Sequence, residues 1–246
     1  MAHTVEVEEL LNVTSDSLIR FLTRWYGEPD LPAAVDLSVV NEMPIPLRTW
    51  HEITSRWSAG VTSFNYPVGP HELELEDGKL VFWVENQGCW TWATSPDGDD
   101  PLVFDRQSSA DPDPWTSTGE TLSEFLLQAT VFEAILGATN LWSAENVTGD
   151  QLSQILTGFR PLPLPNWRWP APDVRILVGR DLLAEASVSM NSDPATERPS
   201  FDVSIAAPSP ELLAHLANVP DVAWRVRPAA SSHGGSAVEP IPDFLR

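Results

Sequence analysis

Apolar residues recur at helical spacing in three long stretches of the chain, and each stretch predicts a helix with one buried face. The stretches are Leu18–Tyr26, Leu47–Trp57 and Leu122–Leu136. The third has the clearest start, because Thr121 and Glu124 have the spacing of a capping box, in which each side chain binds the other's backbone amide. We therefore expect three helices, of which the third is the longest.

A different pattern separates the second and third helices. Glu72–Glu76 alternates between charged and apolar residues, which is typical of a half-buried strand, and Asp77-Gly78 then predicts a tight hairpin turn. Lys79–Val84 is apolar on both faces, so it is expected to be a central strand. Cys89–Ala93 and Leu102–Phe104 complete the set. Sequential strands joined by short turns predict an antiparallel meander.

Three tryptophans surround one turn of this meander, and they have two interpretations. Trp83, Trp90 and Trp92 could form a binding platform, or they could be core residues. Alternation places Trp83 on the face opposite Phe82 and places Trp90 and Trp92 together on one face. We expect the helix over Leu122–Leu136 to cover that second face, which favours the core interpretation.

The turn between these tryptophans consists of Glu85, Asn86, Gln87 and Gly88. A carboxylate beside aromatic rings is found in glycosidases, but those enzymes need a second carboxylate at a set distance. We expect Glu85 and Asn86 to bind backbone amides instead and to set the register of the two strands. Cys89 is expected to be a small core residue, because no activating base is suggested near it.

The remaining sequence predicts an extension to this core. Residues 150–159 and 209–218 read as helices, and 174–178, 182–190, 200–206 and 222–226 read as strands. The first thirteen residues are acidic and are expected to be loosely ordered. The segment 228–246 is rich in Pro, Ser, Gly and Ala, which predicts a flexible tail. We therefore expect a single α+β domain over 1–227, with a core at about 15–140, helices mainly on one side of its sheet, and an α/β extension at about 150–227.

The formal net charge of the 246-residue chain is −21. This charge argues against nucleic-acid binding and against anionic membrane surfaces, because phosphate groups would be repelled. It favours a cationic protein partner, although many soluble proteins are acidic without one. No membrane-spanning run and no secretory signal is expected, and a single cysteine suits a reducing compartment, so we expect a cytoplasmic protein.

No familiar catalytic or metal-binding motif is present. The five histidines lack metal-ligand spacing, and neither a phosphate-binding loop nor a nucleophile elbow occurs. Asp97-Gly98-Asp99-Asp100 resembles a fragment of a calcium loop but lacks its later ligands. We expect no catalytic residues, no metal and no cofactor.

Several of these motifs together resemble the SUKH (Smi/Knr-like) superfamily. They are Trp25-Tyr26-Gly27, Pro46-Leu47-x-x-Trp50, Asp77-Gly78, the Glu85–Gly88 turn followed by Trp90-x-Trp92, Asp100-Pro101-x-Val103, and Leu122-Ser123-Glu124-Phe125-Leu126. The resemblance covers roughly residues 15–140, and residues 165–228 are similar to a less specific extension of some bacterial members. It implies an α+β fold, no enzymatic activity, and a role like that of immunity proteins that bind and neutralise a toxin, often a nuclease.

The leading hypothesis is therefore an immunity-type protein that binds a cationic toxin domain. The candidate binding surface consists of Glu72, Glu74, Glu76, Asp97, Asp99 and Asp100. An intracellular scaffold or regulatory module is the main alternative, and a carbohydrate-binding or glycosidase module that uses the tryptophans is a third. The partner, the binding face and the oligomeric state cannot be derived from the sequence.

Overall fold

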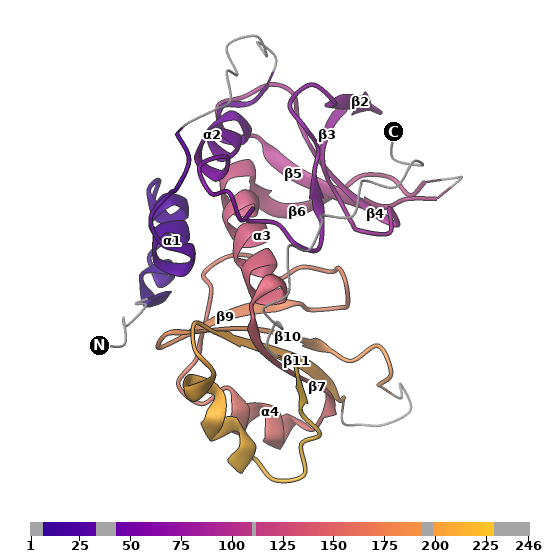
Figure 1. Ribbon diagram of the computed structural model, residues 1–246. Coiled ribbons are helices and arrows are strands. Elements are labelled where there is room, and N and C mark those ends of the chain that lie inside the picture. Colours follow the sequence, from indigo (N-terminus) through magenta and orange to yellow (C-terminus); the bar gives the residue numbers. More distant parts are fainter. Residues whose placement is uncertain (1–6, 33–42, 110–111, 193–198, 229–246) are drawn as a thin grey trace.

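The computed structural model describes residues 7–32, 43–109, 112–192 and 199–228, which form an α+β fold around two antiparallel sheets (Figure 1). The first sheet has the order β1-β3-β4-β5-β6, and β2 also pairs with β3. Its strands are β1 (Tyr66–Pro67), β2 (Glu74–Glu76), β3 (Lys79–Val84), β4 (Trp90–Thr94), β5 (Leu102–Gln107) and β6 (Thr116–Thr121). The predicted meander is confirmed, since β2 to β5 are consecutive in the chain and adjacent in the sheet.

The second sheet has the order β12-β7-β11-β10-β9-β8, and all of its pairings are antiparallel. Its strands are β7 (Asn140–Val147), β8 (Arg160–Pro161), β9 (Arg175–Gly179), β10 (Leu182–Val188), β11 (Phe201–Ala207) and β12 (Arg225–Val226). The sequence indicated the central strands, but it missed β7. Strand β7 belongs to this second sheet and begins at Asn140, before the residues 150–227 that the sequence groups as an extension, and the sheet is antiparallel throughout.

The helices are η1 (Val7–Leu11), α1 (Ser17–Tyr26), α2 (Ile45–Thr54), α3 (Leu122–Gly137), α4 (Gly149–Ile155) and η3 (Pro210–Asn218). The expectation of a loosely ordered N-terminus is wrong for η1, a short 3-10 helix. Its Val7 and Leu10 side chains are 1% and 0% exposed and belong to the main core. Glu8 and Glu9 give this segment its acidic character, but the apolar residues on either side of them, Val7 and Leu10, are buried in the core. The predicted tail lies outside the described residues except for Pro228.

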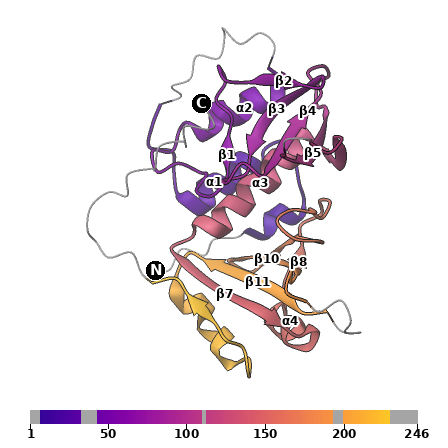
Figure 2. The ribbon, with the colours of Figure 1, turned by 90° about the vertical axis from the view of Figure 1, so that its right-hand side faces the viewer.

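Helix α3 is the centre of the molecule and is buried on all sides. Every residue from Phe125 to Ile135 is buried, including Gln128, Thr130 and Glu133. The helix lies between the two sheets, with α1 and α2 beside it on the same face of the first sheet (Figures 1 and 2). A helix that is apolar all round requires such an enclosed position. The predicted capping box starts it, with Thr121 N donating to Glu124 Oε2 at 2.8 Å.

Aromatic rings fill the space between α3 and the first sheet. The Phe125 ring lies 5.3 Å from Phe82, 6.1 Å from Trp83 and 5.8 Å from Trp92, measured between centroids. The expectation that Trp83 faces away from Phe82 is therefore wrong. The pairing of β3 with β4 shifts register between Val81 and Trp83, and this irregularity lets two consecutive rings reach the same helix.

A second core lies on the far side of the second sheet, where α4 and η3 cover it (Figure 1). Leu152 and Ile155 of α4 and Leu213 and Leu216 of η3 pack there against strand residues such as Ile205. The order of layers is thus first sheet, α3 with its neighbouring helices, second sheet, and outer helices. In the part of the chain that the structure describes, no helix has both the length and the apolar character needed to cross a membrane.

The carboxylate of Glu133 fixes the segment that leads into β1. Its oxygens accept backbone N–H groups from Ser63 at 2.8 Å, Phe64 at 2.6 Å and Asn65 at 2.9 Å. Asn65 is 3% exposed, so its amide would otherwise be buried without a partner, which costs about 1–3 kcal/mol. A single acidic residue on α3 therefore holds the start of the first sheet against the helix.

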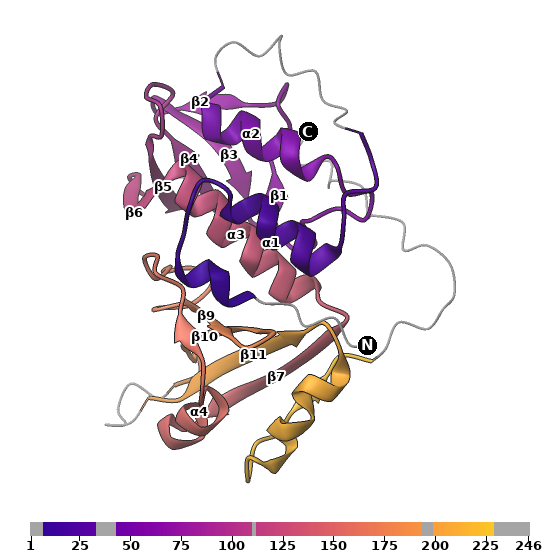
Figure 3. The ribbon, with the colours of Figure 1, turned by 90° about the vertical axis from the view of Figure 1, so that its left-hand side faces the viewer.

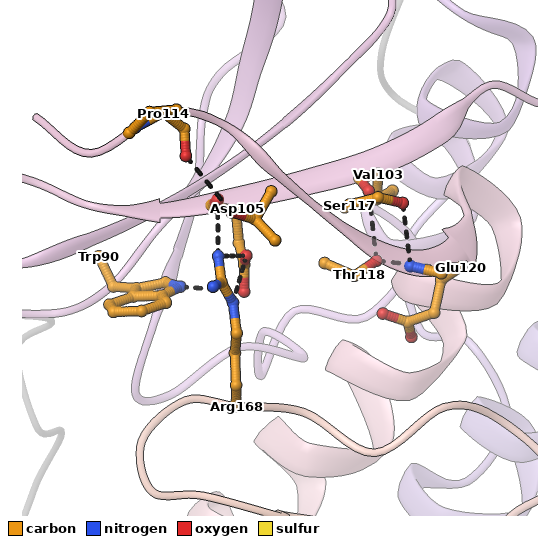
Figure 4. A network of polar contacts seen from close by, with 10 residues as sticks. Trp90, Val103, Asp105, Pro114, Ser117, Thr118, Glu120 and Arg168 are labelled. Carbon is orange, nitrogen blue, oxygen red and sulfur yellow. Dashed lines mark hydrogen bonds and ion pairs between the residues drawn. The ribbon is translucent and has the colours of Figure 1, made fainter.

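A second buried acid, Glu120, joins the first sheet to the segment that precedes β9. The indole N–H of Trp167 donates to both of its carboxyl oxygens, at 3.0 and 3.2 Å. Glu120, which lies beside Thr118 in Figure 4, is fully buried, and this burial raises its pKa to about 8. The folded protein therefore keeps this group protonated at pH values where an exposed glutamate is ionised.

We predict that the free energy of unfolding falls as the pH rises from about 5 to about 8. In that range the unfolded chain has released the Glu120 proton while the folded chain retains it, so folding requires proton uptake. The slope from this group is at most about 1.4 kcal/mol per pH unit. Burial raises the pKa of Glu185 to about 7, which adds a contribution of the same sign.

Urea unfolding of the wild type and of Glu120→Gln at pH 5, 6.5 and 8 measures this effect. The variant keeps an acceptor for Trp167 but has no proton to lose, so its stability is expected to depend less on pH. Glu74→Gln, on an exposed position, is the control and should leave the slope unchanged. Equal slopes for wild type and Glu120→Gln would contradict the prediction.

Candidate protein-binding surface

The two acidic segments singled out in the sequence lie at the same end of the first sheet. The β2–β3 pairing places Leu75 opposite Leu80, and the β3–β4 pairing places Leu80 opposite Thr94. The loop 95–101 follows directly after Thr94, so it lies near the β2–β3 hairpin. All six predicted acidic residues are exposed: Glu72, Glu74, Glu76, Asp97, Asp99 and Asp100.

Glu76 is exposed but is held by an ion pair. Arg106 Nη2 lies 2.5 Å from Glu76 Oε2, and Arg106 Nη1 lies 2.7 Å from Asp77 Oδ2. The arginine side chain is only 7% exposed, and its guanidinium group stacks 4.0 Å from the centroid of the Trp115 ring. Alternation along β5 directs Arg106 away from α3. The Glu76 carboxylate thus serves to neutralise a buried cation on the outer face of the sheet.

Asp100 also has a structural partner. Its carboxylate accepts the Ser123 backbone N–H at 2.9 Å and the Ser123 hydroxyl at 2.6 Å. Both contacts lie in the first turn of α3, where an anion is favoured by unpaired amides and by the helix dipole. Asp100 therefore stabilises the start of the central helix, and its carboxylate is partly neutralised by these contacts.

Glu72, Glu74, Asp97 and Asp99 make up the remainder, which we call the free acidic surface. Within the described ranges, none of these four carboxylates forms an ion pair. The chain's single lysine, Lys79, lies beside them in the hairpin but contacts other residues. Its ammonium group donates to Ser95 Oγ at 3.2 Å and lies 3.9 Å from the centroid of the Phe104 ring. In the described part of the chain, the carboxylates of the free acidic surface therefore have no ion-pair partner.

The Glu85–Gly88 turn has the structural role that the sequence predicts. Glu85 is 4% exposed, and its Oε2 accepts the backbone N–H groups of Gln87 at 2.9 Å and Cys89 at 3.1 Å. Gly88 has a φ of 72°, which favours glycine, and its N–H donates to Glu85 O at 2.8 Å. The carboxylate is thus a turn-forming group that fixes how β3 meets β4.

Cys89 does not lie in the core, contrary to the expectation. Its thiol is exposed and donates to Glu85 Oε2 at 3.0 Å. The strand begins one residue later than expected, at Trp90, so the cysteine belongs to the turn rather than to the covered face. Partial burial and the Glu85 carboxylate both raise the pKa of the thiol, which lowers the thiolate fraction at neutral pH.

Two of the three tryptophans of this region are unavailable to a ligand. Trp83 and Trp92 are each 1% exposed. Trp90 is half-buried, its indole N–H donates to Asp105 Oδ2 at 3.3 Å, and the guanidinium group of Arg168 lies 5.4 Å from the centroid of its ring. The prediction that Trp92 faces the long helix is confirmed, whereas Trp90 lies at the edge of the covered area.

The contact between Asp105 and Arg168 was not foreseen from the sequence. Asp105 is 3% exposed, and its carboxylate pairs with the Arg168 guanidinium group, which also donates to the Asp105 backbone oxygen at 3.0 Å (Figure 4). The two residues lie 63 positions apart, so no local pattern could join them. Their pairing ties the segment before β9 to the first sheet, next to the Glu120–Trp167 contact.

The side chains that could ligate a metal ion do not gather at one site in the described ranges. Among the residues that the structure describes, no group of three His, Cys, Asp or Glu residues is arranged to hold a metal ion. Comparison with protein-family models, with curated proteins and with solved structures finds no match for this chain. The surface with the clearest physical character is the free acidic surface.

We predict that Glu85→Gln increases the rate at which iodoacetamide alkylates Cys89 at pH 7.5. The substitution removes the negative charge that disfavours the thiolate, so the pKa of the thiol should fall toward that of an ordinary cysteine. The pH–rate profile of alkylation, followed by mass spectrometry, measures the shift. Gln87→Ala changes an exposed side chain of the same turn and is the control. A profile that is the same in all three proteins would refute the assignment.

Proposed function

We propose that this chain is a non-enzymatic, immunity-type protein that binds and neutralises a cationic toxin domain through the free acidic surface. One observation supports this proposal most directly. Glu76 and Asp100 have internal partners, whereas Glu74, Asp97 and Asp99 are exposed without an ion pair in the described part of the chain. Clustered charge that serves no internal contact is available to a partner.

The sign and size of the charge indicate the class of partner. The formal net charge is −21, which attracts cationic surfaces over distances of about a Debye length and accelerates encounter. A nuclease domain is cationic where it grips the phosphate backbone of its substrate. An acidic inhibitor could cover such a surface by presenting carboxylates in place of phosphates.

Exposed apolar side chains next to the carboxylates support a protein partner. Leu75 is 63% exposed between Glu74 and Glu76, and Leu102 is 49% exposed at the end of the 95–101 loop. Stable interfaces combine a few apolar anchors with a charged rim. A partner that offers both basic side chains and an apolar depression would bury these leucines as well as neutralise the acids.

The resemblance to SUKH-type immunity proteins agrees with this proposal and suggests that the protein acts inside the cell that it protects. A regulatory scaffold would use the same kind of surface, and the identity of the partner separates the two. A sugar-binding platform is disfavoured, because Trp83 and Trp92 are buried against α3.

The proposal is tested by purifying the chain with the product of a neighbouring toxin-like gene. The double variant Glu74→Lys with Asp99→Lys should weaken the complex at least about tenfold, mainly through a slower association, because steering charge is reversed. The matched control is Glu28→Lys with Glu52→Lys, which changes the net charge equally on exposed positions beside α1 and α2. It should bind almost as the wild type does.

Calorimetric titration and a growth-protection assay provide the two measurements, and thermal unfolding checks that both variants are folded. Equal loss of binding in the two double variants would mean that net charge alone matters. Failure of the wild type to bind any encoded toxin while binding another cellular protein would favour the scaffold and overturn the immunity role.

A further inference from the structure

A cavity of about 190 Å³ lies where α1 and α3 end and where β7 meets β11. Figure 3 shows the last turns of the two helices on the same side of the molecule, close to the start of β7. Trp25 and Tyr26 line it, together with the small residues Ala134 and Ala138 and with Thr139. The cavity is distant from the free acidic surface, which lies at the other end of the first sheet.

Both helices present their C-terminal ends to this cavity. The last carbonyl groups of a helix lack intrahelical partners and carry the negative end of the helix dipole. Helix α3 ends at Gly137, and Ala138 N donates to Ile135 O at 3.2 Å rather than to Ala134 O. Helix α1 ends at Tyr26. Two convergent helix ends therefore make the surroundings of the cavity electronegative.

The chain itself places a cation beside this cavity. The guanidinium group of Arg227 donates to Ala138 O at 2.8 Å, and the Arg227 backbone N–H donates to Leu141 O at 2.9 Å. A guanidinium group thus binds the end of α3 beside the cavity.

We propose that this cavity is a binding site for an organic cation, with a guanidinium or an alkylammonium head. The rings of Trp25 and Tyr26 would attract the charge through their quadrupoles, and helix-terminal carbonyls other than Ala138 O, which Arg227 already binds, would accept its N–H groups. The volume exceeds that of one water, about 30 Å³, several-fold, and it suits the head of an arginine or a small quaternary amine.

Titration of the full chain with N-acetyl-arginine amide, followed by the indole N–H signals in a nitrogen–proton NMR spectrum, tests the site. The Trp25 signal, identified through Trp25→Phe, should shift with saturation. N-acetyl-citrulline amide has almost the same shape without the charge and should cause little shift at the same ionic strength. Tetramethylammonium chloride tests whether the site needs N–H donors or only a cation.

Two variants separate this site from non-specific attraction to an acidic protein. Thr139→Arg places an internal guanidinium at the exposed rim of the cavity and should abolish the shift, whereas Thr139→Gln should retain it. Trp25→Leu removes the indole that reports binding, so this variant is followed by calorimetric titration, in which its affinity for N-acetyl-arginine amide should fall about fivefold through loss of the cation–π contact. The double variant Glu74→Lys with Asp99→Lys should bind the probe as the wild type does, so failure here is distinguishable from failure of the proposed function.

Saturation below about 1 mM would indicate that a free small molecule is the ligand. Saturation only above about 10 mM would indicate that the cationic head normally arrives as a side chain of a larger partner. The proposal is overturned if citrulline and arginine derivatives shift the Trp25 signal equally, or if the shift persists in Thr139→Arg. No shift of this signal up to about 50 mM probe would also overturn it.

Discussion

The complete burial of α3 is the constraint on which the rest of the molecule depends. A helix without a polar face can be stable in water only when other elements surround it, and a single six-stranded sheet covers one side at most. The second sheet is therefore part of the same core, with Val178, Leu183 and Ala206 in one cluster with Phe125 and Phe132. The sequence suggests a core with an extension. In the structure the two parts share one hydrophobic core around α3, because neither sheet alone would enclose the helix.

Polar contacts then fix how the layers meet. Glu133 attaches the start of the first sheet to α3, Asp100 stabilises the N-terminus of α3, and Asp105 and Glu120 join the first sheet to the segment before β9. Several acids of this very acidic chain thus serve internal purposes. The free acidic surface contains none of these internal acids, so it is smaller and more localised than the composition suggests.

Local signals in the sequence were sufficient for the elements that depend on neighbouring residues. The Thr121–Glu124 capping box, the Asp77-Gly78 hairpin and the Glu85 turn are set by contacts within a few positions. Contacts across many positions left no such signal, which is why the Asp105–Arg168 pair, the strand β7 and the cavity beside Tyr26 were missed. Strict alternation predicts that the Trp83 ring faces away from Phe82, but the irregular pairing after Val81 turns it toward α3. In the candidate surface, exposure was foreseeable, but the partners of Glu76 and Asp100 were not.

The placement of the single lysine has a consequence for covalent modification. Thirteen of the fourteen basic Lys and Arg residues are arginines, so an enzyme or reagent that acylates side-chain amines finds only Lys79 in the whole chain. That ammonium group rests on the Phe104 ring beside the hairpin that carries Glu74. Acylation would remove a positive charge beside the free acidic surface and deepen its negative potential. One chemical event could therefore tune the affinity of this surface without altering the surface itself.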